Sequence, residues 1–291
     1  AGLLCPSGTF EETLPDGLKP YRDGMNFSGE GSLAFWQWVR QELGLPPSID
    51  YDPVVEPTPT PTPTPAPTPT PGPSTTAYVI GDSVYLRLVR DLGDGDTPGV
   101  EVVSGTLLGC GVLPRTSEAS AGRCDDRLDR WRDDVETVDP NVVIVGLSEL
   151  DLLDHNVGSR LVPFGSEEFR GMALAEFDRA LDIVDPEGTA TVKIVTIPCP
   201  APISFEAPFG DLTLAERAER ATWLNELAEE YASSAISHDV DVLDASVLLC
   251  SDGGALEQVF GADVRDDGSH FTAEGSALFW SWLLPQLGAE A

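Results

Sequence analysis

Basic residues are scarce in this chain of 291 residues, which has 17 lysines and arginines against 49 aspartates and glutamates. The resulting net charge of −32 repels phosphate backbones, so we expect no nucleic-acid partner. No apolar run in the sequence approaches the roughly 20 residues of a membrane-spanning helix. The sequence also lacks a glycine-rich phosphate loop, which together with its negative charge argues against a nucleotide-binding protein.

Cysteine and histidine are also rare, with five and three residues respectively. The cysteines form no Cys-x-x-Cys pair and no cluster with histidine, so we expect no metal site and no other cofactor. Cysteines without metal-ligand spacing are compatible with disulfides, which form in extracellular proteins. The odd count leaves one cysteine without a partner inside this sequence.

Proline and threonine dominate residues 57–73, which repeat Pro-Thr and close with Pro-Gly-Pro. Proline fixes φ and removes a backbone donor, so this segment predicts an extended polyproline II linker. It divides the chain into a head, residues 1–56, and a body, residues 74–291.

The body alternates short β-prone runs with helical segments. Strands are predicted at 77–80, 100–104, 142–146, 192–197 and 240–243, and helices at 84–91, 123–137, 166–184 and 214–235. Val142-Val143-Ile144-Val145 is continuously apolar, which is typical of a strand buried on both faces. The alternation predicts a three-layer α/β/α sandwich with a five-stranded parallel sheet, in which ligands bind at the carboxyl ends of the strands.

The head repeats part of the body. Asp23-Gly24-Met25-Asn26-Phe27 matches Asp267-Gly268-Ser269-His270-Phe271, and the segment 31–38 matches 275–282 with its tryptophans in register. We therefore expect the head to be the C-terminal remnant of a preceding copy of the body fold. Because Asn26 stands where the body has His270, that copy would lack a histidine base.

The same repeat explains the odd number of cysteines. Leu3-Leu4-Cys5 matches Leu248-Leu249-Cys250, so the partner of Cys5 would lie on the preceding copy. Four cysteines then remain in the body, and we prefer the pairs Cys110–Cys124 and Cys199–Cys250. Four cysteines allow three connectivities, and the sequence does not choose among them.

A candidate nucleophile lies in Gly81-Asp82-Ser83, where the first strand ends and a helix begins. The free backbone N–H groups at a helix start point toward whatever the Ser83 hydroxyl attacks. An aspartate or serine before a helix is also the ordinary helix cap. The nucleophile interpretation therefore requires a base elsewhere in the chain.

The candidate base is His270, in Asp267-Gly268-Ser269-His270 just before the last helix. An aspartate three residues before a histidine can accept a hydrogen bond from Nδ1, which leaves Nε2 free to take a hydroxyl proton. The alternative is a capping aspartate beside a solvent-facing histidine. The other two histidines are weaker candidates: His238 next to Asp239 reads as a surface or capping residue, and His155 follows an acidic run.

These two motifs together resemble the first and last blocks of the SGNH (GDSL-type) hydrolases. The resemblance covers nearly all of residues 77–287 and implies a catalytic triad of Ser83, His270 and Asp267. It also implies an oxyanion hole, with backbone N–H groups from Ser83 and from Gly111 in Leu108-Gly109-Cys110-Gly111; Gly109 is the second choice.

The block that usually reads Gly-x-Asn-Asp departs from the family. Here it is Gly146-Leu147-Ser148-Glu149, so the asparagine donor is replaced by Ser148, which could act as a weaker donor. We expect Glu149 to point away and to hydrogen-bond a loop, because a carboxylate beside an oxyanion would be unfavourable.

This departure, with Leu-Leu-Cys before the last block and Pro198-Cys199 after the fourth strand, resembles the extracytoplasmic SGNH domains associated with membrane acyltransferases. The resemblance implies a serine esterase or O-acyltransferase that acts on acylated carbohydrate or small esters outside the cell, with a membrane acyltransferase as partner. The alternative is a catalytically weak glycan-binding or spacer module on the same fold. The oligomeric state is not predicted.

Overall fold

The computed structural model describes residues 75–288, with gaps at 93–96, 98, 114–123, 125, 158–159, 205–211 and 252–253. The predicted head, residues 1–56, and the predicted linker, residues 57–73, lie outside the described residues, as do their repeat and Cys5.

The described domain is organised around five parallel strands in the order β2-β1-β3-β6-β7. Their bounds are β1 Thr75–Ile80, β2 Val100–Ser104, β3 Val142–Gly146, β6 Thr191–Val195 and β7 Asp239–Leu243. β3 lies at the centre of the sheet, and every one of its residues is buried, as the continuous apolar run predicts. The prediction of a five-stranded parallel α/β fold is confirmed.

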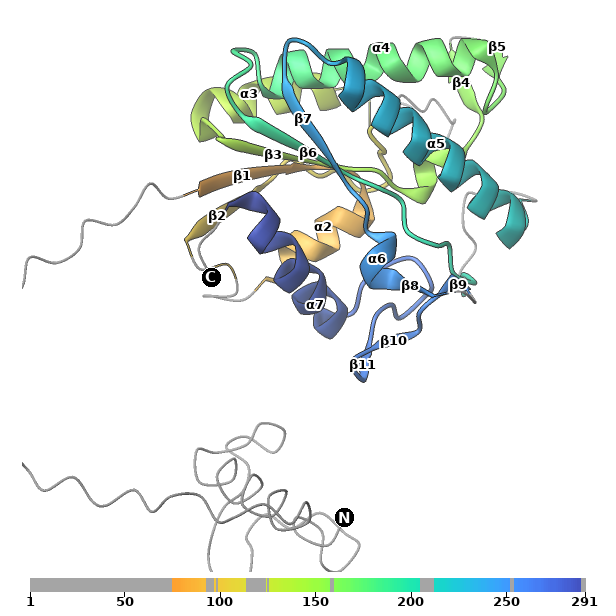
Figure 1. Cartoon of the computed structure of the whole chain (residues 1–291). Coiled ribbons are helices and arrows are strands. Elements are labelled where there is room, and N and C mark those ends of the chain that lie inside the picture. Colours follow the sequence, from red (N-terminus) through yellow and green to blue (C-terminus); the bar gives the residue numbers. More distant parts are fainter. Residues whose placement is uncertain are drawn as a thin grey trace, which may run out of the picture. The chain divides into compact units, whose positions relative to one another are not determined.

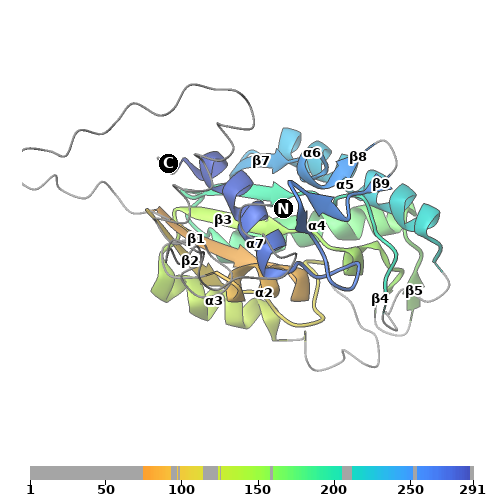
Figure 2. The same cartoon turned by 90° about the horizontal axis from the view of Figure 1, so that it is seen from below.

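Helices cover both faces of this sheet (Figure 1). They are α2 Ser83–Arg90, α3 Arg127–Val138, α4 Glu167–Val184, α5 Leu214–Ser234 and α7 Ala273–Leu283. Side chains from α3, α4 and α5 share one hydrophobic core with Tyr78 and Val143, and side chains from α2 and α7 share a second core with Val79 and Ile144. Adjacent strand residues therefore face opposite cores, which gives three layers. In Figure 1, α2 and α7 lie below the sheet, and Figure 2 views the molecule from that side.

Short elements were not predicted from the sequence. They are η1 Glu149–Leu152, β4 His155–Val157, β5 Arg160–Val162, α6 Ser246–Leu249, β8 Cys250–Ser251, β9 Gly254–Ala255, β10 Gln258–Val259, β11 Ala262–Asp263 and η2 Leu284–Leu287. β6, the fourth of the predicted strands, also ends earlier than predicted, at Val195 rather than Ile197. The Ile197 backbone instead exchanges two hydrogen bonds of 2.9 Å with the side-chain amide of Asn225, so it leaves the strand ladder.

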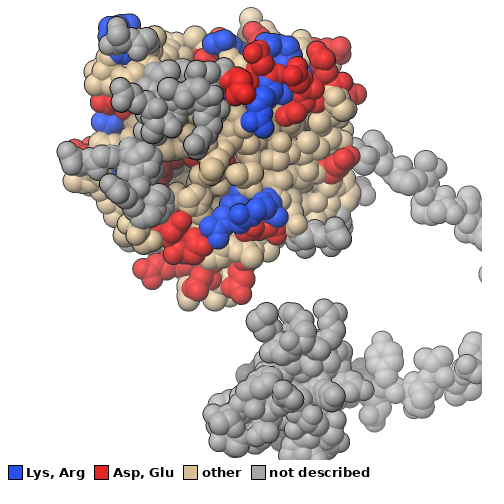
Figure 3. All heavy atoms as spheres, turned by 180° about the vertical axis from the view of Figure 1, so that it is seen from behind, with Lys and Arg blue, Asp and Glu red and all other residues tan. Residues whose placement is uncertain are grey.

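Both preferred disulfides are present, with Cα atoms 5.6 Å apart for Cys110–Cys124 and 5.7 Å apart for Cys199–Cys250. Each one holds a segment that follows the carboxyl end of a strand. No helix in the described part of the chain is both long and apolar enough to cross a membrane. On the face in Figure 3, basic side chains lie in small groups beside acidic ones.

Candidate active site

Ser83 is the first residue of α2 and directly follows the turn at the end of β1. Gly81 enters this turn with φ of +151°, a region that favours glycine. The buried Asp82 caps the helix by accepting a hydrogen bond of 2.9 Å from the Val84 N–H. The cap and the nucleophile interpretations are therefore not exclusive: Asp82 is the cap, and the Ser83 hydroxyl is left for other partners.

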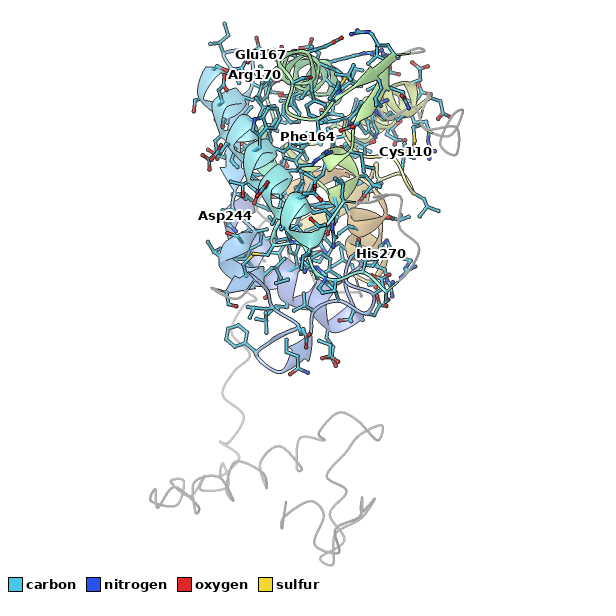
Figure 4. The ribbon with its side chains drawn as sticks, turned by 90° about the vertical axis from the view of Figure 1, so that its right-hand side faces the viewer. Cys110, Phe164, Glu167, Arg170, Asp244 and His270 are labelled. Carbon is cyan, nitrogen blue, oxygen red and sulfur yellow. A yellow bond between two sulfur atoms is a disulfide. The ribbon has the colours of Figure 1, made fainter. Side chains whose placement is uncertain are left out.

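His270 provides the partner of Ser83. Its Nε2 lies 2.9 Å from Ser83 Oγ, although the two residues are 187 positions apart in the sequence. Its Nδ1 lies 2.7 Å from Asp267 Oδ2. The structure thus places the three residues expected to form a triad in one hydrogen-bonded chain, with the imidazole between the hydroxyl and the carboxylate. Figure 4 views the carboxyl edge of the sheet, where His270 lies.

The turn that carries Asp267 and His270 is fixed by its own backbone. Asp267 Oδ1 accepts from the N–H groups of Ser269, at 2.9 Å, and of His270, at 2.8 Å. Gly268 has φ of +87°, and a Cβ there would lie 1.9 Å from the carbonyl oxygen of Pro202, so only glycine fits.

Hydrogen bonds also keep the Asp267 carboxylate charged. Partial burial alone would raise its pKa, but the donors from His270 and Ser269 outweigh burial and hold the pKa below its ordinary value. An ionised Asp267 next to Nδ1 favours the tautomer in which Nε2 accepts a proton from Ser83.

An ion pair joins the helix of the serine to the turn of the histidine. Arg87 on α2 lies 2.7 Å from the carboxylate of Asp266, the residue before Asp267. This pair is partly exposed, so we assign it a positioning role and only a small contribution to stability.

The segment of the predicted oxyanion glycine follows β2 and is held by Cys110–Cys124. Gly111 is buried against Asp151, and a Cβ at Gly111 would lie 2.3 Å from Asp151 Oδ1. Gly109, the second choice, has φ of +75° and open space around its Cα, so it serves the turn. The assignment of the Gly111 N–H to an oxyanion stays a prediction.

Ser148 follows the carboxyl end of β3 and is the N-cap of η1. Its hydroxyl accepts from the Leu150 N–H and lies 3.3 Å from Asp151 Oδ2, to which it donates. Asp151 also accepts from the N–H groups of Leu113, at 2.9 Å, and of Ser148, at 3.0 Å. The Ser148 hydroxyl is thus shared with a buried carboxylate, and its role toward an oxyanion stays a prediction.

Asp151 is a residue that the sequence interpretation missed. It is fully buried, and burial raises its pKa to about 7, although hydrogen bonds from Leu113 and Ser148 oppose the shift. Burial also raises the pKa of the nearby Asp82, and the hydrogen bond from the Val84 N–H is the main effect that opposes this. The spacing Ser148-x-x-Asp151 is that of a capping box and was the signal available in the sequence.

Glu149 has a different partner from the loop that we expected. Its carboxylate forms a buried ion pair with Arg217 on α5, and Arg217 also donates to the Ala201 carbonyl at 2.9 Å. Burial raises the pKa of Glu149, while the charge of Arg217 opposes this. The expectation of a loop partner is wrong because a helix arginine, also buried, lies within reach.

The other histidines lie away from this chain of hydrogen bonds. His155 is fully buried beside the ring of Phe169, with the ring centroids 5.1 Å apart. The His238 side chain is only 6% exposed and contacts the carboxylates of Asp182 and Asp185, so its assignment to the surface is wrong. Among the described residues, no group of three or more metal-ligating side chains comes together.

No protein-family model and no curated protein matches the sequence. Solved structures do match. A carbohydrate acetylesterase from Sinorhizobium meliloti aligns with a TM-score of 0.49 and 14% identity, over 74% of this chain and 98% of that chain. The inhibitor-bound aryl esterase of M. smegmatis aligns with a TM-score of 0.50 and 16% identity, over 74% of this chain and 98% of that chain. The domain therefore has the α/β fold that this aryl esterase also has.

Proposed function

We propose that the domain is a serine ester hydrolase or O-acyltransferase of the SGNH type. One observation carries the proposal: Ser83, His270 and Asp267 form a hydrogen-bonded chain at the carboxyl edge of the sheet. Ser83 Oγ lies 2.9 Å from His270 Nε2, and His270 Nδ1 lies 2.7 Å from Asp267 Oδ2. The resemblance of the two motifs to SGNH hydrolases gives the same three roles.

The reaction begins when Ser83 Oγ attacks the ester carbonyl and His270 Nε2 takes its proton. Asp267 orients the imidazole and stabilises its positive charge. Backbone N–H groups of Ser83 and Gly111 hold the oxyanion. His270 then gives the proton to the departing alcohol, which leaves an acyl-serine. Water or a sugar hydroxyl attacks this acyl-enzyme in the second half, with His270 again as base.

A groove at the same edge supports a carbohydrate as the alcohol part of the substrate. It has a volume of about 820 Å³ and includes Glu226, Glu229 and Asp244 in its walls. This volume is in the range of small-molecule sites, and the carboxylate groups suit sugar hydroxyls. Figure 4 labels Asp244 and His270 in the view of this edge.

We further propose an extracellular or cell-surface location, and a membrane acyltransferase as partner. The two disulfides support the location, because such bonds persist in oxidising compartments. The partner rests on the sequence resemblance alone, in the block Gly146–Glu149, in Leu248-Leu249-Cys250 and in Pro198-Cys199.

The test is hydrolysis of p-nitrophenyl acetate by the full chain and by Ser83→Ala. We expect Ser83→Ala to lower kcat about 10³-fold or more, because the nucleophile is removed. Ser233→Ala is the matched control, since the exposed Ser233 hydroxyl donates a hydrogen bond to the Glu229 carbonyl of its own helix. Equal rates for all three proteins would overturn the enzyme proposal and favour a binding or spacer module.

A further inference from the structure

A small cavity opens beside the triad, on the side of α7. Val84 and Ser269, the chain neighbours of Ser83 and His270, both line it. Its volume is about 30 Å³, against about 820 Å³ for the groove at the same edge. The narrower space suits a short acyl chain, whereas the groove suits the bulkier alcohol part of an ester.

Apolar side chains form most of the wall, among them Leu147, Ile197 and Phe279. Arg265 is the cation in that wall, and it lies only two residues before Asp267 in the sequence. Its Nη1 atom is buried and has no hydrogen-bond partner in the described part of the chain. The guanidinium carbon lies 5.7 Å from the centroid of the Phe271 ring, which packs against it without accepting its hydrogen bonds.

Glu149 is the carboxylate in the same wall, but its ion-pair partner is a different arginine. It forms the buried ion pair with Arg217, and no ion pair between Glu149 and Arg265 is found among the described residues. Burial lowers the pKa of Arg265, and the charge of Glu149 opposes this, so the arginine stays protonated. The cavity wall thus carries one positive charge, and its Nη1 group donates to no acceptor among the described residues.

We propose that this cavity binds the acyl group of the substrate, and that Arg265 binds a carboxylate at the far end of a short acyl chain, as in a malonyl or succinyl half-ester. The proposal rests on the proposed esterase function. A guanidinium matches a carboxylate with two parallel hydrogen bonds, and the match is strong away from water. In a chain with net charge −32, an anionic substrate needs such a local cation.

The test compares two esters of 4-methylumbelliferone with acyl chains of four carbons, the hemisuccinate and the butyrate. We expect the full chain to prefer the hemisuccinate. Arg265→Gln should lower kcat/KM for the hemisuccinate about 10- to 100-fold, which is what a hydrogen bond to a charged group is worth, and leave the butyrate nearly unchanged. Arg265→Lys keeps the charge and should retain part of the preference.

Arg90→Gln is the matched control, because Arg90 lies on α2 with a side chain 62% exposed and outside the cavity wall. The Arg90→Gln variant should prefer the hemisuccinate over the butyrate as strongly as the unchanged protein does. If Arg265→Gln slows both esters equally, or if the full chain favours the butyrate, the proposal is overturned.

A second measurement separates this proposal from the esterase function. Free succinate should raise the Tm of the full chain and of Ser83→Ala, but not that of Arg265→Gln, and free butyrate should raise none of them. An inactive full chain whose Tm rises with succinate in this way would refute the esterase function and support the carboxylate site. A full chain that hydrolyses the esters, but shows neither this Tm shift nor the preference for the hemisuccinate, would support the esterase function and refute the carboxylate site. Arg265→Gln itself should not lower Tm, because the Nη1 group that it removes has no hydrogen-bond partner among the described residues; a lowered Tm would indicate a structural role instead.

Discussion

Two turns at the carboxyl edge of the sheet have the same spacing and opposite environments. In the first, Asp267 and His270 are three residues apart, and both side chains are partly exposed. In the second, Ser148 and Asp151 are three residues apart, and both are buried. Each aspartate accepts two backbone N–H groups and one side-chain donor.

The environments set the charge of the two carboxylates. Asp267 has a lowered pKa, because hydrogen bonds outweigh its partial burial, so it is ionised and suits a partner that becomes positive. Asp151 has a pKa raised to about 7 by burial, so it suits a structural role in which protonation costs little. The same spacing thus gives the proposed orienter of His270 in one turn and a structural bridge to Leu113 in the other.

The largest effect is expected from a substitution in the first turn. Asp267→Asn removes the carboxylate that fixes the His270 tautomer, and we expect kcat for p-nitrophenyl acetate to fall about 10³- to 10⁴-fold while the fold persists. The control is Asp266→Asn, because the neighbouring carboxylate contacts Arg87 rather than the imidazole. Similar losses in both variants would show that the turn acts through its shape and not through the Asp267 charge.

The two turns also differ in how far the sequence predicted them. Asp267 and His270 were found because their roles depend on a local motif and on the rarity of histidine in the chain. The parallel sheet was found because its strands are short apolar runs between helical segments. Local pattern was sufficient in these cases.

Tertiary contacts explain what the sequence interpretation missed. Asp151 gains its role from Leu113, which is 38 residues away, and Glu149 pairs with Arg217, which is 68 residues away. Trp280 of α7 likewise donates to the Leu88 carbonyl across 192 residues. No periodicity or spacing in one sequence reports such pairs, because each partner alone reads as an ordinary polar or apolar position.

The second prediction concerns a substitution in the buried turn. Asp151→Asn replaces one acceptor oxygen by an N–H₂ group that faces a backbone N–H, so we expect the free energy of unfolding at pH 7 to fall by about 1–3 kcal/mol. Urea unfolding measures this loss. Asp129→Asn is the control, since that side chain is 76% exposed on α3, and it should change stability little.

The same variant has a pH dependence with a defined sign. The folded-state pKa of Asp151, about 7, lies above its ordinary value of 3.8. Between these values the folded protein holds a proton that the unfolded chain has released, so the contribution of Asp151 to stability decreases as the pH rises from about 4 to 7. The loss caused by Asp151→Asn should therefore be larger at pH 5 than at pH 7. A loss that grows with pH would mean that Asp151 is ionised in the folded protein.

The smallest expected effect tests whether the buried turn also takes part in the reaction. Ser148 has one hydroxyl proton, and Asp151 lies 3.3 Å from its oxygen, a long hydrogen bond that an oxyanion could compete for. A dedicated oxyanion donor is worth about 10²–10³ in kcat. A shared one should be worth less, so we expect Ser148→Ala to lower kcat about tenfold, with KM nearly unchanged. A full loss of about 10²-fold would make Ser148 a dedicated oxyanion donor. An unchanged kcat would leave Ser148 as the cap of η1 and the oxyanion to the backbone donors alone.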